Sequence, residues 1–95
     1  MTRDEARQIA LDEIKRGYRG REEIVMIDSQ TLTKPYGWIF SYNTRRFVEG
    51  EVIHGLGGNG PIVVDSATGK VTRLGTARSM EQEIADFESR NGHRS

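Results

Sequence analysis

A helix-forming pattern opens the chain and a second one closes it, so strands have to be sought in the residues between them. At the opening, Thr2 and Glu5 have the spacing of a capping box, in which each side chain bonds a free backbone N–H at a helix start. Gly17 marks the expected end, because glycine tolerates the left-handed conformation common after a helix. Apolar residues recur between them every three or four positions and predict one buried face: Ala6, Ile9, Ala10 and Ile14, with Leu11 and Tyr18 at its margin.

The closing pattern has the same construction. Ser79 and Gln82 again have capping-box spacing, and Asn91-Gly92 is a natural helix end. Residues 93–95 are expected to form a frayed tail. The apolar stripe of this helix consists of Met80, Ile84 and Phe87.

Two strands are predicted after the first helix. Residues 24–32, IVMIDSQTL, are largely β-branched and aliphatic, and Pro35 then breaks the pattern because it cannot donate to a sheet ladder. In the next run, GWIFSYN, the side chains of Trp38, Phe40 and Tyr42 alternate onto one face. We expect these aromatics in the core, with an exposed anchor for another protein as the competing interpretation. The two strands should pair antiparallel through the turn.

Residues 45–60 fit no single pattern. Their apolar side chains could belong to a short strand or to a folded-back loop, and five glycines interrupt any regular repeat. The apolar residues concerned are Phe47, Val48, Val52 and Ile53.

A β-hairpin is predicted after this undecided region. Pro61 opens the strand IVVD, Gly69 supplies the positive φ of the turn, and KVTRL forms the returning strand. We therefore expect a single α+β domain over residues 1–92. It should contain an antiparallel sheet of about four strands, with an N-terminal and a C-terminal helix.

The hexamer GLGGNG at residues 55–60 satisfies the phosphate-binding pattern G-x-G-x-x-G. That fingerprint requires a helix directly after the glycines, because the helix N-terminus offers free N–H groups to phosphate. Here Pro61 and a strand follow instead. The glycines are interpreted as a tight turn, or as a loop that a partner chain approaches closely, with Asn59-Gly60 favouring left-handed conformations.

Charge and composition exclude several classes of partner. Fourteen Lys and Arg offset fourteen Asp and Glu, whereas a protein that binds nucleic acid needs a basic surplus on one face. No cysteine is present, which excludes disulfides and thiolate chemistry. No apolar run approaches the roughly 20 residues of a membrane span, so we expect no membrane partner and a cytoplasmic location.

No constellation of residues predicts catalysis or metal binding. The two histidines, His54 and His93, lie far apart in the sequence and in dissimilar settings. Without paired ligands, His54 is interpreted as a partly exposed loop histidine. The carboxylates of the first helix are sequence neighbours that point apart, and no serine lies in a G-x-S-x-G elbow. We expect no enzyme and no cofactor.

Several motifs taken together resemble the immunity protein 35 family, also called the YrhB-like domain. The resemblance runs from about residue 37 to residue 87, and its strongest pieces are Gly37-Trp38, Gly58-Asn59-Gly60-Pro61, Asp65 with Thr68-Gly69, and Gly75-Thr76-Ala77. Members of that family look like immunity proteins of bacterial polymorphic toxin systems, which bind a cognate toxin domain and block it. Papain-like peptidase toxins are among the suggested targets. The resemblance implies an α+β fold without catalysis, and the motif residues are interpreted as a folding signature.

A toxin-neutralising binding protein that acts by stoichiometric occlusion is the first functional hypothesis. Its expected partner contacts lie in and around the glycine loop: Tyr36, Arg45, Arg46, His54 and Asn59. One alternative is a chaperone-like protein that covers apolar segments of many unfolded clients. Another is an accessory domain of a peptidase or modification system, because PIVVDSATGKV is similar to the end of PepSY-type propeptide domains.

Overall fold

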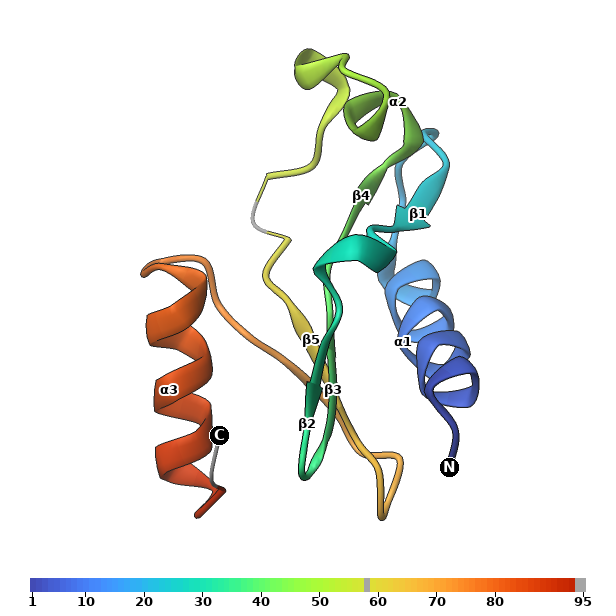
Figure 1. Cartoon of the computed structure of the whole chain (residues 1–95). Helices are drawn as coiled ribbons and strands as arrows, with labels where there is room; N and C mark the ends of the chain where they lie inside the picture. Colours follow the sequence, from blue (N-terminus) through green and yellow to red (C-terminus); the bar gives the residue numbers. More distant parts are fainter. Residues whose placement is uncertain (58, 94–95) are drawn as a thin grey trace.

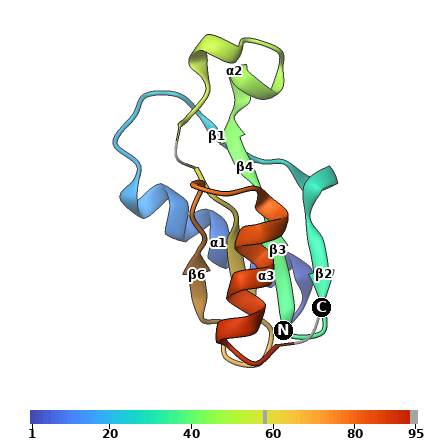
Figure 2. The same ribbon diagram turned by 90° about the vertical axis from the view of Figure 1, so that its left-hand side faces the viewer.

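Two helices lie on opposite faces of an antiparallel sheet, as Figures 1 and 2 show. The structure is a computed structural model and describes residues 1–57 and 59–93, apart from the side chain of His54. Gly58 and the side chain of His54, both singled out in the sequence, therefore lie outside the described part. The order of elements, with helices at either end and strands between them, confirms the predicted α+β class.

Helix α1 (Arg3–Gly17) begins with the predicted capping box. The Thr2 hydroxyl accepts a hydrogen bond from the Glu5 N–H at 3.1 Å, and the Glu5 carboxylate accepts one from the Thr2 N–H at 2.8 Å. The helix ends at Gly17, but the expected left-handed conformation is wrong. Tyr18 instead takes an extended backbone conformation, which lets its ring pack against the core that α1 covers.

Helix α3 (Met80–Arg90) repeats this arrangement at the other end of the chain. Ser79 and Gln82 form the second capping box, with both hydrogen bonds at 3.2 Å. The helix ends before Asn91-Gly92, and Gly92 has a left-handed φ of 67°. The predicted apolar stripe is buried at Ile84 and Phe87, while Met80 remains exposed.

The main sheet has four antiparallel strands in the order β2-β3-β5-β6, which confirms the predicted strand number and pairing sense. These strands are β2 (Leu32–Lys34), β3 (Gly37–Phe40), β5 (Ile62–Asp65) and β6 (Val71–Arg73). The β3 and β5 strands are central and pair over their full length. Both predicted hairpins are present, and Gly69 has the expected positive φ of 74°.

The two strands predicted at residues 24–32 and 37–43 are each divided in the structure. A helical turn, η1 (Asp28–Gln30), separates β1 (Ile24–Met26) from β2, and β1 pairs with β4 (Tyr42–Thr44) in a two-stranded sheet. At this interruption the guanidinium of Arg7 on α1 donates to the Asp28 carboxylate at 2.8 Å. The helical turn η1 thus lies where the chain forms an ion pair with α1. The largely apolar sequence of residues 24–32 predicted one continuous strand there.

Each face of the sheet has its own core, because alternate side chains of a strand point to opposite faces. Phe40 and Tyr42 are buried in the core that α1 covers, and Trp38 packs against it, which confirms the predicted aromatic face. Ile39, between Trp38 and Phe40, faces α3. The core under α3 consists of Tyr36, Ile39, Val63, Leu74, Ile84 and Phe87.

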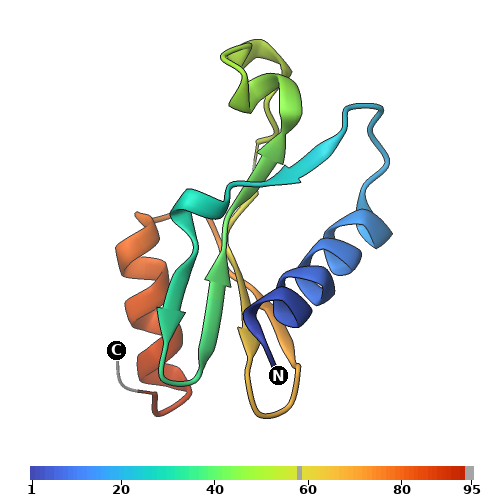
Figure 3. The ribbon, with the colours of Figure 1, turned by 45° about the vertical axis from the view of Figure 1, so that its right-hand side comes forward.

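Residues 45–57 form no strand and fold back as two short helical turns. These are α2 (Arg45–Val48) and η2 (Val52–His54), which project beyond the sheet at one end of the molecule (Figure 3). Of the two alternatives for this region, a short strand or a folded-back loop, the structure has the folded-back loop. We call residues 45–57 the tip.

Gly60 is required for a reason that differs from the expected one. Neither Asn59 nor Gly60 has a positive φ, so the expectation of left-handed conformations is wrong. Gly60 is buried instead, and a Cβ added there would overlap the carbonyl group of Leu74. The backbone on either side of Gly60 therefore packs directly against the start of the connection from β6 to α3.

We expect Gly60→Ala to lower the free energy of unfolding by at least about 2 kcal/mol, because the new methyl group must displace backbone atoms. The matched control is Gly57→Ala, where nothing lies within 4 Å of the added Cβ. That variant should be neutral or more stable by up to about 1 kcal/mol. Urea denaturation of both variants measures the difference, and equal stabilities would contradict the packing argument.

The β5–β6 turn is stabilised by the carboxylate of Asp65. Its Oδ1 accepts hydrogen bonds from the N–H groups of Ala67 at 2.8 Å and Thr68 at 3.0 Å. These backbone hydrogen bonds, with Ala67 contributing most, lower the pKa of Asp65 below its ordinary value.

Because the pKa of Asp65 is lower in the folded protein, its charged form stabilises the fold at neutral pH, and this contribution is lost as the pH falls through the folded pKa. Wild type should therefore be more stable than Asp65→Asn at pH 7, and the difference should shrink as acid protonates the folded carboxylate. Thermal unfolding at a series of pH values tests this. A difference that stays constant with pH would show that the carboxylate charge is irrelevant to the turn.

Candidate functional site

The tip carries the two most exposed large apolar side chains of the described residues, with a third beside them. Val48 is 49 % exposed, Val52 is 70 % exposed and Ile53 is 88 % exposed. Aliphatic side chains of this size usually lose most of their exposed surface on folding, and adjacent exposed ones mark candidate interaction sites. In Figure 1 the tip stands at the opposite end of the molecule from the β2–β3 and β5–β6 turns.

Buried polar groups fix the base of the tip. The Asn43 side-chain oxygen accepts the N–H of Thr44 at 2.8 Å and the N–H of Leu56 at 2.9 Å, which ties the returning chain to the end of β4. Thr44 caps α2 by accepting the Phe47 N–H at 3.1 Å. Because Asn43 and Thr44 are buried, these bonds are shielded from water and hold the tip in one orientation.

Two arginines bind the tip to the loop that follows α1. Arg45 donates through two nitrogens to the carboxylate of Glu23, at 2.8 and 2.9 Å. Arg46 does the same to Glu51, at 3.1 and 2.9 Å, and also lies 3.4 Å from Glu22. The hydrogen bond with Arg45 lowers the pKa of Glu23, and both arginines remain exposed. Their charges are thus largely offset within the chain.

A groove of about 300 Å³ lies beneath the tip, between β4 and the start of α3. Asn59 lines it and donates its side-chain N–H to the Tyr42 carbonyl oxygen at 2.8 Å. The charged side chain in the lining is Arg78, which pairs with Glu83 and Asp86 at 3.3 Å. The other lining residues are uncharged and include Ile27, Gln30, Ser41, Asn43, Phe47, Pro61, Thr76 and Met80. The groove therefore suits an uncharged segment of mixed polarity.

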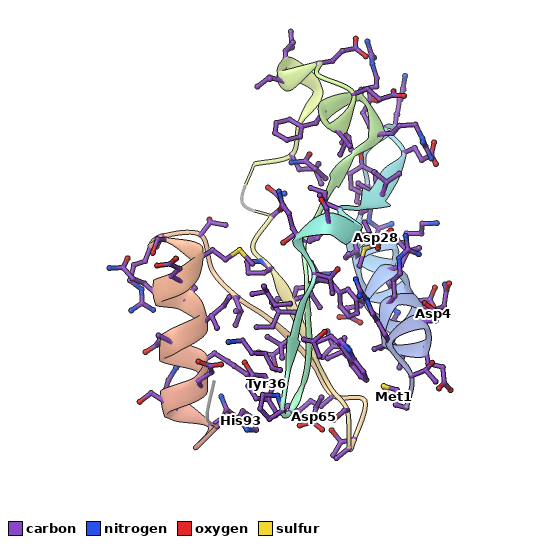
Figure 4. All side chains as sticks on the ribbon, in the orientation of Figure 1. Met1, Asp4, Asp28, Tyr36, Asp65 and His93 are labelled. Atoms are coloured by element: carbon purple, nitrogen blue, oxygen red, sulfur yellow. The ribbon has the colours of Figure 1, made fainter. Side chains whose placement is uncertain are left out.

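The structure brings four of the predicted contact residues to this end of the molecule. Arg45, Arg46 and the backbone of His54 lie on the tip, and Asn59 lies in the groove below it. Tyr36 is at the opposite end of the molecule, as Figure 4 shows. Its side chain is buried, so a partner would contact little of it.

Tyr36 instead holds α3 against the sheet. Its hydroxyl donates to the Glu88 carboxylate at 2.8 Å, and the Lys34 ammonium lies 3.2 Å from the same carboxylate. Burial, followed by the hydrogen bond to Glu88, raises the pKa of Tyr36. His93, placed in a frayed tail by the sequence analysis, stacks on the Tyr36 ring with a centroid distance of 4.2 Å.

The described residues include no group of three metal-ligating side chains that could hold an ion. Among the same residues, no helix has the length and apolar character that crossing a bilayer requires.

Sequence reasoning missed the exposed aliphatic residues of the tip. Val48, Val52 and Ile53 were assigned to a strand or a folded-back loop, without a prediction that water would contact them. One weak signal is present, because Gly50 and Gly55 bracket Val52 and Ile53. Two adjacent apolar residues are fewer than the roughly four to eight of a typical buried strand.

These features define a small α+β domain with a neutral groove and a projecting apolar tip. The chain belongs to the immunity protein 35 family, whose model matches residues 4–86. It is also similar to the uncharacterised protein YrhB of Escherichia coli strain K12, with 38 % identity over 53 residues. That match covers 55 % of this chain and 56 % of YrhB, so the chain spans about half the length of this curated relative. No solved structure matches the chain.

The buried hydrogen bond between Tyr36 and Glu88 yields a prediction of stability. Tyr36→Phe removes the donor and leaves a buried carboxylate with one partner fewer, so unfolding should become easier by about 1–2 kcal/mol. The same substitution at Tyr18 is the control, because its partly buried hydroxyl accepts a hydrogen bond from the Glu22 N–H at 3.1 Å. Chemical denaturation should show the larger loss at Tyr36. A larger loss at Tyr18 would contradict this role of the Glu88 contact.

Proposed function

We propose that this protein is an immunity protein that neutralises a cognate bacterial toxin by stoichiometric occlusion, without catalysis of its own. Membership of the immunity protein 35 family supports a protein toxin as the partner. The observation that carries the assignment of a binding surface is the exposure of Val48, Val52 and Ile53 on a projecting tip. The partner surface would consist of the tip together with the groove beneath it.

The physical argument starts from the cost of leaving these side chains in water. Burying an exposed valine or isoleucine contributes about 1.5–3 kcal/mol, so the tip can supply the apolar centre of an interface. Such centres usually contribute most of the binding free energy, while a polar rim excludes water. Here the paired arginines Arg45 and Arg46 would form that rim. A standard interface would bury roughly 800 Å² on each partner.

A convex tip fits a concave partner surface better than a flat one. We propose that it blocks the toxin by covering the mouth of its active-site cleft, and that the uncharged groove receives a neighbouring loop of the toxin. Papain-like peptidase toxins are the target class proposed from the family resemblance. On this proposal the protein acts in the cytoplasm of a cell that encodes a polymorphic toxin system.

Co-expression with the toxin domain encoded beside the gene tests the proposal. Wild-type protein should restore growth, and the double variant Val52→Asp/Ile53→Asp should not, because two carboxylates would have to be desolvated in the interface. We expect the affinity for the purified toxin to fall by at least about 100-fold. The matched control is Leu32→Asp on β2, another exposed aliphatic residue outside the tip, which should retain both rescue and affinity.

Each other outcome has a distinct meaning. If wild type gives no rescue and the neighbouring gene product is not toxic, the immunity function is wrong. If the tip variant rescues as well as wild type, while the circular dichroism of both is unchanged, another surface binds the toxin.

The exposed aliphatic side chains also suit a chaperone-like protein that binds unfolded clients. This second candidate predicts suppression of aggregation of a heated reporter enzyme, and loss of suppression in the tip variant. Protection no better than that of an inert protein of equal size would exclude it. The third candidate, an accessory domain of a peptidase, predicts binding to a protease encoded nearby.

A further inference from the structure

The chain contains two Asn-Gly pairs, Asn59-Gly60 and Asn91-Gly92. In both pairs the asparagine side-chain N–H donates to a main-chain carbonyl oxygen at 2.8 Å. Asn59 donates to Tyr42, and Asn91 donates to Phe87. The two amide groups are therefore restrained alike, whereas the glycines that follow them are in different surroundings.

Asn-Gly pairs can modify themselves. The backbone nitrogen of the glycine attacks the side-chain carbonyl carbon Cγ of the asparagine and loses its proton to hydroxide or water. A new C–N bond closes a succinimide ring, the bond from Cγ to Nδ2 breaks, and ammonia leaves. Water then opens the ring at either carbonyl group, giving aspartate or isoaspartate. In the net reaction, the side-chain amide and one water molecule give a carboxylate and an ammonium ion.

The reaction requires the backbone between the two residues to rotate and the glycine N–H to be accessible to base. Glycine permits the rotation because it has no Cβ. Where the glycine is packed against other backbone, that freedom is lost unless the segment opens locally.

Gly60 does not have this freedom. It is buried, and a Cβ there would overlap the carbonyl group of Leu74 and press on Gly75. Rotating the Asn59–Gly60 peptide would drive the backbone into the same atoms. Ring closure at Asn59 therefore needs the segment to separate from the backbone of Leu74 and Gly75.

Gly92 has this freedom. It is exposed, a Cβ there would meet nothing within 4 Å, and its N–H makes only a long hydrogen bond of 3.4 Å to the Ser89 carbonyl oxygen. Asn91 is exposed as well, so water and hydroxide have access to the peptide. Rotation of this peptide needs the 2.8 Å hydrogen bond from the His93 N–H to the Glu88 carbonyl oxygen to open, which is a change at the end of α3 only.

We infer that Asn91 is a site of spontaneous deamidation in the folded protein, whereas Asn59 is protected by the packing of Gly60. The inference does not depend on the proposed function. Deamidation at Asn91 removes the donor to the Phe87 carbonyl oxygen and places a negative charge at the C-terminus of α3, where the helix dipole disfavours it. An isoaspartate also lengthens the backbone just before His93, which displaces the imidazole from the Tyr36 ring.

The test compares the two sites within one protein. Purified protein is incubated at 37 °C and mildly alkaline pH, and the peptides that contain each site are quantified by mass spectrometry over time. In folded protein, Asn91 should deamidate at least about tenfold faster than Asn59, because Asn59 must wait for local opening. In concentrated urea the two rates should converge. Equal rates in the folded protein, or a faster rate at Asn59, would overturn the inference.

The effect of deamidation on the stability of α3 is measured with two substitutions at Asn91, which need no incubation to form. Asn91→Asp should lower the melting temperature at once, and aged wild type should approach its value. Asn91→Gln keeps the amide but must close a larger ring, so its melting temperature should stay constant over the same incubation. An aged wild type that deamidates at Asn91 and melts unchanged would overturn the link between this site and α3.

Discussion

The pairing of β3 with β5 is the interaction on which the rest of the structure depends. These two strands are central in the sheet, and the side chains of Ile39, Phe40, Ile62, Val63 and Val64 are almost fully buried. Because strand residues alternate, this one pair supplies apolar side chains to both cores. Helices α1 and α3 do not need to contact each other. Each is stabilised by its own face of the same strand pair.

The sequence predicts the parts of the fold that depend on local chemistry. Both capping boxes form because their partners are three residues apart and need no tertiary structure. The alternation of Trp38, Phe40 and Tyr42 likewise fixes a face within one strand run. The division of residues 24–34 by η1 was not predictable in this way, since Arg7 and Asp28 meet only after α1 has packed on the sheet. His93 is a similar case, because its stacking partner Tyr36 is distant in sequence.

The candidate site was predicted less completely than the fold. Arg45, Arg46 and Asn59 were selected for their positions beside the glycine loop, and the structure places them on the tip or in the groove. Tyr36 was selected as a neighbour of the same loop, but it lies at the opposite end of the molecule, where its hydroxyl group donates to Glu88. Exposure is the property that sequence patterns report least well for aliphatic residues. Val52 and Ile53 look like core residues until the backbone around them is known.

The arginine pairs at the tip give salt a local effect. Arg45 with Glu23 and Arg46 with Glu51 are exposed ion pairs, and exposed pairs weaken as ionic strength rises and the Debye length shortens. The two cores contain mainly apolar side chains and respond to salt in the opposite direction or hardly at all. Ionic strength therefore acts on the Arg45–Glu23 pair, which holds the tip to the loop after α1, and on the Arg46–Glu51 pair within the tip. The buried hydrogen bonds of Asn43 and Thr44 at the base of the tip are not screened, so concentrated salt weakens its outer contacts while this base, the sheet and both helices keep their packing.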